Sequence, residues 1–175
     1  MSEKLAISIL ENRDKEAYIS SIIRSYSQYK EHFSESDWIL YVQSLIDPIK
    51  NDESDITYVV KSGEVIVGGL QIYFGAQKAY QLEHLAIDGP IIRFLFVDPT
   101  SQGKGIAQQL LQFVYKQLAE RGYSEVHLHS GEMMQKSIAL YQYLGYERVP
   151  TKDFYIDEFP IYGFKYQFVK HRQVH

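Results

Sequence analysis

A short loop between an apolar strand and an amphipathic helix carries residues suited to phosphate binding. In the stretch VDPTSQGKGIAQQ, Gly103 and Gly105 flank Lys104, and a helical pattern begins at Ile106. The first N–H groups of a helix have no intrahelical partner and lie at the positive end of its dipole. We therefore expect the backbone amides of residues 102–107 to bind a phosphate or pyrophosphate, with Lys104 adding positive charge.

Two common phosphate-binding motifs do not fit this loop. A dinucleotide-binding fingerprint requires a third glycine where Gln108 stands. A nucleoside triphosphatase loop requires Ser or Thr directly after Gly-Lys, and Gly105 occupies that position. One alternative stays open, namely that the glycines only permit a tight turn from strand to helix.

The composition excludes several classes of protein. The chain has 175 residues, 45% of them hydrophobic, which predicts a single domain over residues 1–175. A net charge of −4, with scattered Lys and Arg, argues against nucleic-acid binding. No cysteine is present, so disulfides and a cysteine nucleophile are excluded, and the histidine spacing predicts no metal. No apolar run approaches the ~18 residues of a membrane span, and we expect a cytoplasmic protein.

The elements around the loop indicate a mixed α/β fold. Alternating apolar residues predict strands, apolar residues at helical spacing predict helices, and Gly and Pro mark their ends. Single strands are expected over residues 4–10, 91–97, 124–130 and 162–169, and the strand over 91–97 is expected to be buried on both faces. A hairpin is expected over 55–74, with its turn at Ser62 and Gly63. Helices are expected over residues 14–30, 34–46, 106–122 and 134–144, and Pro48 is expected to stop the second of them. Residues 75–90 are expected to be irregular.

Two segments together resemble the GNAT family of N-acetyltransferases. The family's coenzyme A loop has Gln or Arg, two free positions, Gly, one free position, and Gly or Ala; Gln102 to Ala107 match it. Downstream, SIALYQYLGY, from Ser137 to Tyr146, resembles the family's second signature. The resemblance implies a splayed, mostly antiparallel sheet of about six or seven strands flanked by four helices. It also implies that acetyl-coenzyme A lies between strands 91–97 and 124–130.

The resemblance also implies roles for individual residues. Backbone amides near Phe96 and Val97 would hold the pantetheine arm and polarise the thioester, and Tyr141 would protonate the leaving thiolate. Tyr143 and Tyr146 are interpreted as packing or surface residues. The residues implied in binding the co-substrate are Phe96, Val97, Gln102, Gly103, Lys104, Gly105, Ile106, Ala107 and Ser137.

The general base is left open by the sequence. Ile91 and Ile92 stand where some family members carry a glutamate, and Met134 replaces an asparagine that is frequent in the family. Loss of that amide raises a second hypothesis, a sensor that binds acyl-coenzyme A without turnover. The candidate bases are Glu83, His84, Asp88, His127, His129, Glu132 and water.

The acceptor is expected to be a primary amine of a small molecule or a peptide. Three segments, residues 26–38, 75–90 and 150–161, are expected to shape its site, and a homodimer is plausible from the aromatic tail. Direct attack in a ternary complex is favoured, because no serine lies in a nucleophile elbow. Side chains that could line a site for a cationic amine are Tyr26, Tyr29, Phe33, Phe154, Tyr155, Asp157 and Glu158.

Overall fold

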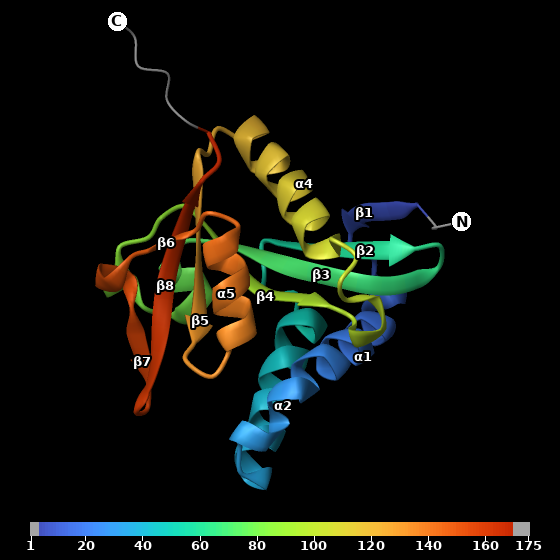
Figure 1. Cartoon of the computed structure of the whole chain (residues 1–175), viewed down its shortest axis with the longest axis horizontal. Helices are drawn as coiled ribbons and strands as arrows, with labels where there is room; N and C mark the ends of the chain where they lie inside the picture. Colours follow the sequence, from blue (N-terminus) through green and yellow to red (C-terminus); the bar gives the residue numbers. More distant parts are fainter. Residues whose placement is uncertain (1–3, 170–175) are drawn as a thin grey trace, which may run out of the picture. The chain divides into compact units, whose positions relative to one another are not determined.

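The computed structural model describes residues 4–169, which contain a mixed sheet and five α-helices (Figure 1). The strands follow one another in the order β1-β2-β3-β4-β5-β8-β6, and β7 also pairs with β8. The chain divides into two compact units. Among the described residues, one unit contains 4–72 and 94–113, and the other contains 73–93 and 114–169.

The first unit combines an antiparallel meander with two long helices. Strands β1 (Leu5–Ile9), β2 (Ile56–Ser62) and β3 (Val65–Phe74) pair antiparallel, with Ile7 opposite Val60 and Val59 opposite Gly69. The other elements are α1 (Lys15–Tyr26), the 3-10 segment η2 (Ser27–His32), α2 (Glu35–Lys50), the end of β4 (Pro90–Val97) and the start of α4 (Ile106–Glu120).

The core of the first unit lies between α1, α2 and the sheet. Tyr18 is fully buried, and its ring meets that of Phe96 edge-on at 5.1 Å. A Cβ placed on Gly69 would lie 2.5 Å from the Tyr18 ring and 2.6 Å from the Tyr58 carbonyl oxygen. Glycine at position 69 therefore allows α1 to approach β3. The other buried members of this core are Ile22, Leu45, Ile49, Val59 and Ile66.

The second unit is built around β8 (Phe159–Gln167). Strand β5 (Glu125–Gly131) pairs antiparallel with β8 and parallel with the start of β4. The short strands β6 (Glu147–Arg148) and β7 (Phe154–Ile156) also pair with β8. The unit further holds α3 (Ala76–Tyr80), the end of α4 and α5 (Gln135–Tyr143), with a core of Tyr73, Ala76, Ala79, Leu85, Ile87, Ile91 and Phe154.

The predicted fold class is confirmed, with additions. The eight strands and five α-helices of the described residues exceed the six or seven strands and four helices expected, because β6, β7 and α3 have five residues or fewer. The hairpin, with Gly63 at φ 62°, is confirmed. So are the helix ends near Gly122 and Gly145, both at φ 94°.

Three expectations about elements were wrong in detail. Pro48 does not stop α2, which continues to Lys50, and burial of Pro48 and Ile49 offsets the lost hydrogen bond of the proline. Residues 75–90, expected to be irregular, contain α3 and the 3-10 turn η3 (Glu83–Leu85). Strand β4 is fully buried only over Pro90–Ile92 and at Phe96, and its other residues are half-buried.

Candidate active site

The glycine loop has the local geometry expected of an anion site. Gly103 and Gly105 adopt φ values of 79° and 75°, which favour glycine, and α4 begins directly afterwards at Ile106. A Cβ added at either glycine would meet no atom within 4 Å. Space on this side of the loop is therefore open to a ligand, and the first-turn amides of a fifteen-residue helix lie beside it.

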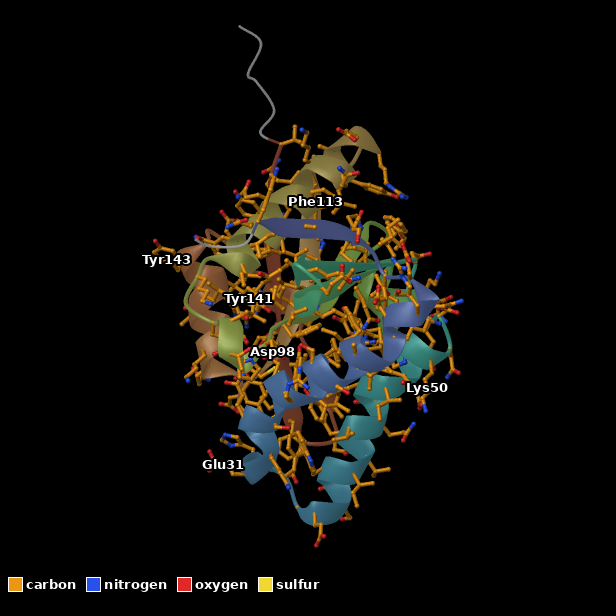
Figure 2. All side chains as sticks on the ribbon, turned by 90° about the vertical axis from the view of Figure 1, so that its right-hand side faces the viewer. Glu31, Lys50, Asp98, Phe113, Tyr141 and Tyr143 are labelled. Atoms are coloured by element: carbon orange, nitrogen blue, oxygen red, sulfur yellow. The ribbon has the colours of Figure 1, made fainter. Side chains whose placement is uncertain are left out.

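A buried carboxylate joins this loop to α1. Asp98 is 3% exposed, follows β4 directly, and is labelled in Figure 2. Its carboxylate accepts hydrogen bonds from Ser21 Oγ at 2.7 Å and from Arg24 Nε and a terminal Arg24 nitrogen at 3.2 and 2.7 Å. It also accepts from the backbone N–H and the hydroxyl of Thr100, at 3.2 and 2.8 Å. This network fixes the chain just before the glycine loop.

The charge of Asp98 is stabilised in the folded protein. Burial raises the pKa of the Asp98 carboxyl, but the hydrogen bonds from Ser21, Arg24 and Thr100 outweigh burial and bring it to about 2. Asp98 is therefore ionised at neutral pH. No local sequence pattern indicates this network, because Ser21 and Arg24 lie 77 and 74 residues from Asp98 along the chain.

Strand β4 carries a strained residue where its pairing with β5 ends. The described register between β4 and β5 comprises Ile91 opposite His127 and Ile92 opposite Leu128. Two residues later, Phe94 adopts φ 57°, a left-handed conformation that is unfavourable for an aromatic residue. Such strain is concentrated at functional sites. Phe94 lies two residues before Phe96, near which the backbone is predicted to hold the pantetheine arm.

Tyr141, the expected acid, lies in α5 within the second unit (labelled in Figure 2). It is 8% exposed, and its ring lies 5.6 Å from the ring of Tyr146 and 6.2 Å from that of Phe164. Ser137 lies one turn earlier and is half-buried. The ring of Tyr141 is thus held between Tyr146 and Phe164 in the interior of the second unit.

The neighbouring tyrosines have different environments. Tyr143 is 80% exposed, whereas Tyr146 is buried and its hydroxyl is hydrogen-bonded to that of Tyr115. Burial is the main cause that raises the pKa of both Tyr115 and Tyr146. These positions agree with the interpretation of Tyr143 and Tyr146 as surface and packing residues.

His129 has both ring nitrogens engaged. Its Nε2 lies 2.9 Å from the Lys152 carbonyl oxygen, which can only accept, so Nε2 carries the proton. Nδ1 therefore accepts from the Tyr80 hydroxyl at 3.0 Å. Burial is the main cause that lowers the pKa of His129, to about 4. This arrangement favours a structural role, linking β5 to the segments that carry Tyr80 and Lys152.

The other candidate bases are spread over the second unit. His127 is 9% exposed, and burial is the main cause that lowers its pKa. Glu83 and His84 line a pocket of about 710 Å³ with Gln77, Gln81 and Leu82. Asp88 and Glu132 are exposed. Among residues 4–169, no group of three or more His, Asp or Glu side chains is arranged to hold a metal ion.

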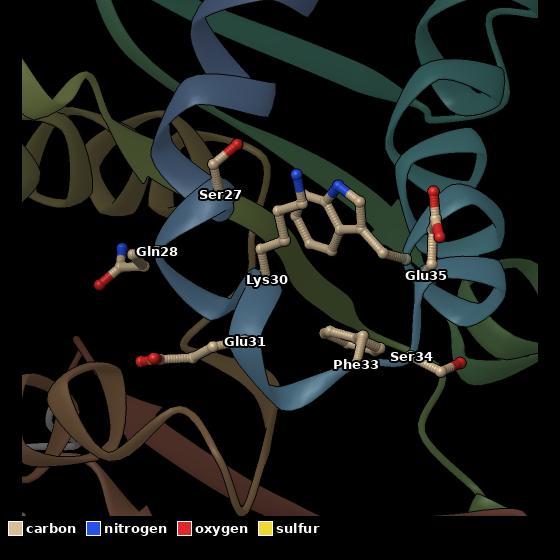
Figure 3. Close-up of a pocket in the computed structure, with 8 residues that line it drawn as sticks. Ser27, Gln28, Lys30, Glu31, Phe33, Ser34 and Glu35 are labelled. Atoms are coloured by element: carbon tan, nitrogen blue, oxygen red, sulfur yellow. The ribbon is translucent and has the colours of Figure 1, made fainter.

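A second pocket, of about 610 Å³, lies between η2 and the first turns of α2 (Figure 3). Figure 3 shows Lys30 and Phe33 directed towards α2, with Gln28 and Glu31 on the opposite side of η2. Phe33 stacks on Tyr41 at 4.8 Å and lies 5.7 Å from Trp38. The full lining is Ser27, Gln28, Lys30, Glu31, Phe33, Ser34, Glu35 and Trp38.

The three segments expected to shape the acceptor site differ in the solvent exposure of their side chains. Residues 26–38 and 75–90 each contribute to a pocket, although Tyr29 is itself buried. In the third segment Phe154 is buried in the core of the second unit, whereas Tyr155 is 70% exposed. Asp157 and Glu158 are exposed in the turn between β7 and β8.

Comparison with known proteins agrees with this geometry. The model of the acetyltransferase (GNAT) family matches residues 16–146, which is more than half of the chain. The chain belongs to the GNAT acetyltransferase family. Acetyl-coenzyme A is the usual co-substrate of this family. No helix in the part of the chain that the structure describes is long and apolar enough to cross a membrane.

Similar GNAT proteins include two human relatives. The chain is 31% identical to N-acetyltransferase 8 over 129 residues, covering 63% of this chain and 50% of that protein. It is 29% identical to N-acetyltransferase 8B over 137 residues, covering 68% of this chain and 54% of the relative. The chain thus spans about half the length of these relatives.

Solved GNAT structures share the fold at low sequence identity. The PaiA N-acetyltransferase from Thermoplasma acidophilum, in complex with coenzyme A, has a TM-score of 0.70 and 16% identity, covering 93% of this chain and 99% of that one. An acetyltransferase from Thermus thermophilus has a TM-score of 0.69 and 15% identity, covering 95% and 99%. These likenesses extend over nearly the whole of this GNAT chain.

Proposed function

We propose that residues 1–175 form one N-acetyltransferase domain that moves an acetyl group from acetyl-coenzyme A to a primary amine by direct attack in a ternary complex. The observation that supports it most is the glycine loop: Gly103 and Gly105 have positive φ values, and open space faces both. Gln102 to Ala107 would hold the diphosphate through backbone amides, with Lys104 at the rim. Acetyl-coenzyme A supplies an acyl carbon activated as a thioester.

The transfer requires two proton movements. A nitrogen–carbon bond forms and the carbon–sulfur bond breaks, so the amine must lose a proton and the leaving sulfur must gain one. Tyr141 gives its proton to that sulfur, and backbone N–H groups of β4 near Val97 stabilise the negative oxygen. The proton of the amine leaves through water or one of the candidate bases. Because both nitrogens of His129 are engaged, the geometry favours the other candidates.

Two measurements test this function. Thermal unfolding with and without coenzyme A should show stabilisation by about 2.7 kcal/mol at a ligand concentration of 100 times the dissociation constant. A panel of small-molecule and peptide amines should then yield free thiol from acetyl-coenzyme A. Absence of any stabilisation by coenzyme A would contradict the proposed function.

One observation supports the alternative, an acyl-coenzyme A sensor without turnover. Met134 stands where many family members have asparagine, and it caps α5 without a side-chain hydrogen bond. Stabilisation by coenzyme A without thiol release from any amine would favour this alternative. We also expect a cytoplasmic protein, and light scattering would test whether it forms a homodimer.

The pocket between η2 and α2 is the proposed site for the body of the acceptor. Phe33 and Trp38 provide apolar rings for it, and the charged lining residues carry both signs, with Lys30 directed towards α2. Trp38→Ala should raise KM for a reactive amine about tenfold while leaving KM for acetyl-coenzyme A within twofold. An unchanged KM for the amine would show that the acceptor binds elsewhere.

A further inference from the structure

The backbone of β4 divides its hydrogen-bonding groups between two edges. The Asp98 amide donates to the Val67 carbonyl of β3 at 2.8 Å. The Phe96 carbonyl oxygen also faces β3, since it lies 2.8 Å from where a Cβ on Gly68 would be. Backbone groups alternate in direction along an extended strand. Those of Leu95 and Val97 therefore point to the opposite edge, beyond the position where pairing with β5 has ended.

The carbonyl oxygens on that edge accept hydrogen bonds from side chains. The Tyr26 hydroxyl donates to the Leu95 carbonyl oxygen at 3.2 Å. The Gln102 side-chain amide donates to the Val97 carbonyl oxygen at 3.2 Å. A strand edge ordinarily presents N–H donors and C=O acceptors in turn. When side-chain donors take the acceptors, the edge presents N–H groups to an approaching ligand.

We propose that Tyr26 is a positioning residue for acyl transfer, which occupies the Leu95 carbonyl so that the edge of β4 at Leu95 and Val97 presents hydrogen-bond donors to the thioester oxygen. This inference rests on the proposed function. Without the Tyr26 hydroxyl, the Leu95 carbonyl would be an acceptor beside the oxygen that gains negative charge, and the two would repel. The edge would then be less complementary to the transition state.

The surroundings of Tyr26 fix its ring. Tyr26 is half-buried at the end of α1, 6.0 Å from the ring of Tyr29 and 6.2 Å from that of Tyr41. The ring is therefore held from the α1–α2 side, while the hydroxyl reaches a strand 69 residues further along the chain. Tyr26→Phe would keep this packing and remove only the donor. It is a sharper variant than one that also removes the ring.

The first test is kinetic. Tyr26→Phe should lower kcat about tenfold, with KM for acetyl-coenzyme A and the dissociation constant of coenzyme A within twofold of wild type. Tyr41→Phe is the matched control, because Tyr41 belongs to the same ring cluster and stacks on Phe33. A kcat of Tyr26→Phe within twofold of wild type, or an equal fall in Tyr41→Phe, would overturn the proposal.

The second test does not need turnover. Hydrogen exchange of the peptide that contains Leu95 and Val97 should be slowed more by acetyl-coenzyme A than by coenzyme A in wild type, because only the thioester has the carbonyl oxygen. Tyr26→Phe should lose at least half of this difference. Equal protection by the two ligands in wild type, or an unchanged difference in the variant, would overturn the role of Tyr26. Absence of coenzyme A binding to wild type would instead count against the proposed function.

Discussion

The hydroxyl of Ser21 donates a 2.7 Å hydrogen bond to the buried carboxylate of Asp98, which lies 77 residues further along the chain. Ser21 is on α1, and Asp98 directly precedes the turn that leads into the glycine loop. Helix α1 therefore helps to hold the glycine loop in place, although α1 lies far from the loop in the sequence. A hydrogen bond to a buried charge is also stronger than one between neutral groups.

Removing this anchor should weaken both the fold and coenzyme A binding. Ser21→Ala should lower the free energy of unfolding by about 1–3 kcal/mol, since it leaves a buried carboxylate with one donor fewer. It should also raise KM for acetyl-coenzyme A severalfold. Thermal unfolding and initial-rate kinetics measure the two effects. Ser44→Ala is the control, because that hydroxyl is exposed, lies outside both pockets and donates locally to the Tyr41 carbonyl oxygen. Equal free energies of unfolding and equal KM values in the two variants would contradict this role of Ser21.

Phosphate binding by the glycine loop can be tested with a control glycine just beyond the other end of α4. Gly103→Ala places a methyl group in the open space of the loop, and its positive φ costs about 1 kcal/mol of stability. Gly122→Ala, at the other end of α4, has a similar φ penalty and also points into open space. We expect coenzyme A affinity, measured by calorimetry, to fall at least tenfold for Gly103→Ala only. Similar affinities in the two variants would contradict phosphate binding by this loop.

Tyr141 is tested by the loss of its hydroxyl. Tyr141→Phe keeps the ring against Tyr146 and Phe164, so the fold and the dissociation constant of coenzyme A should change little. Loss of a general acid should lower kcat about a hundredfold. Tyr143→Phe, at an exposed position of the same helix, should have full activity. Equal losses of kcat and affinity in Tyr141→Phe would argue against the acid role.

The lowered pKa of His129 should make the free energy of unfolding depend on pH. Burial lowers its pKa to about 4, below the reference value of 6.5, so the unfolded chain binds a proton more readily than the folded protein. The free energy of unfolding should therefore fall as pH decreases from about 6.5 towards 4, by roughly 2–3 kcal/mol from this group. Denaturant unfolding at several pH values measures the slope. His129→Gln should reduce it, whereas His84→Gln, at an exposed position, should not; equal slopes in all three proteins would contradict the role of His129.

Local backbone requirements explain which features were predictable. Gly103, Gly105, Gly122 and Gly145 all adopt positive φ values, which glycine favours, so the loop and the helix ends left a signal in the sequence. The hairpin was predictable for the same reason. Phe94 also has a positive φ, but nothing about a phenylalanine indicates it.

Tertiary packing explains what the sequence did not reveal. The contacts of Ser21 with Asp98 and of Tyr26 with Leu95 join positions about seventy residues apart, and no local pattern indicates them. Burial of Pro48 within α2 overrode its usual effect as a helix stop. The five residues of α3 are too few for a helical period to be recognised.

The close approach of Tyr18 to Gly69 restricts how this protein can evolve. Shortening the side chain at position 18 would relieve one of the two clashes that any larger residue at position 69 would cause. The other clash is with the Tyr58 carbonyl oxygen, which belongs to the main chain of β2 and cannot be removed by a substitution. Compensating mutations at position 18 alone should therefore fail to rescue Gly69→Ala, and glycine should persist there while neighbouring core residues drift.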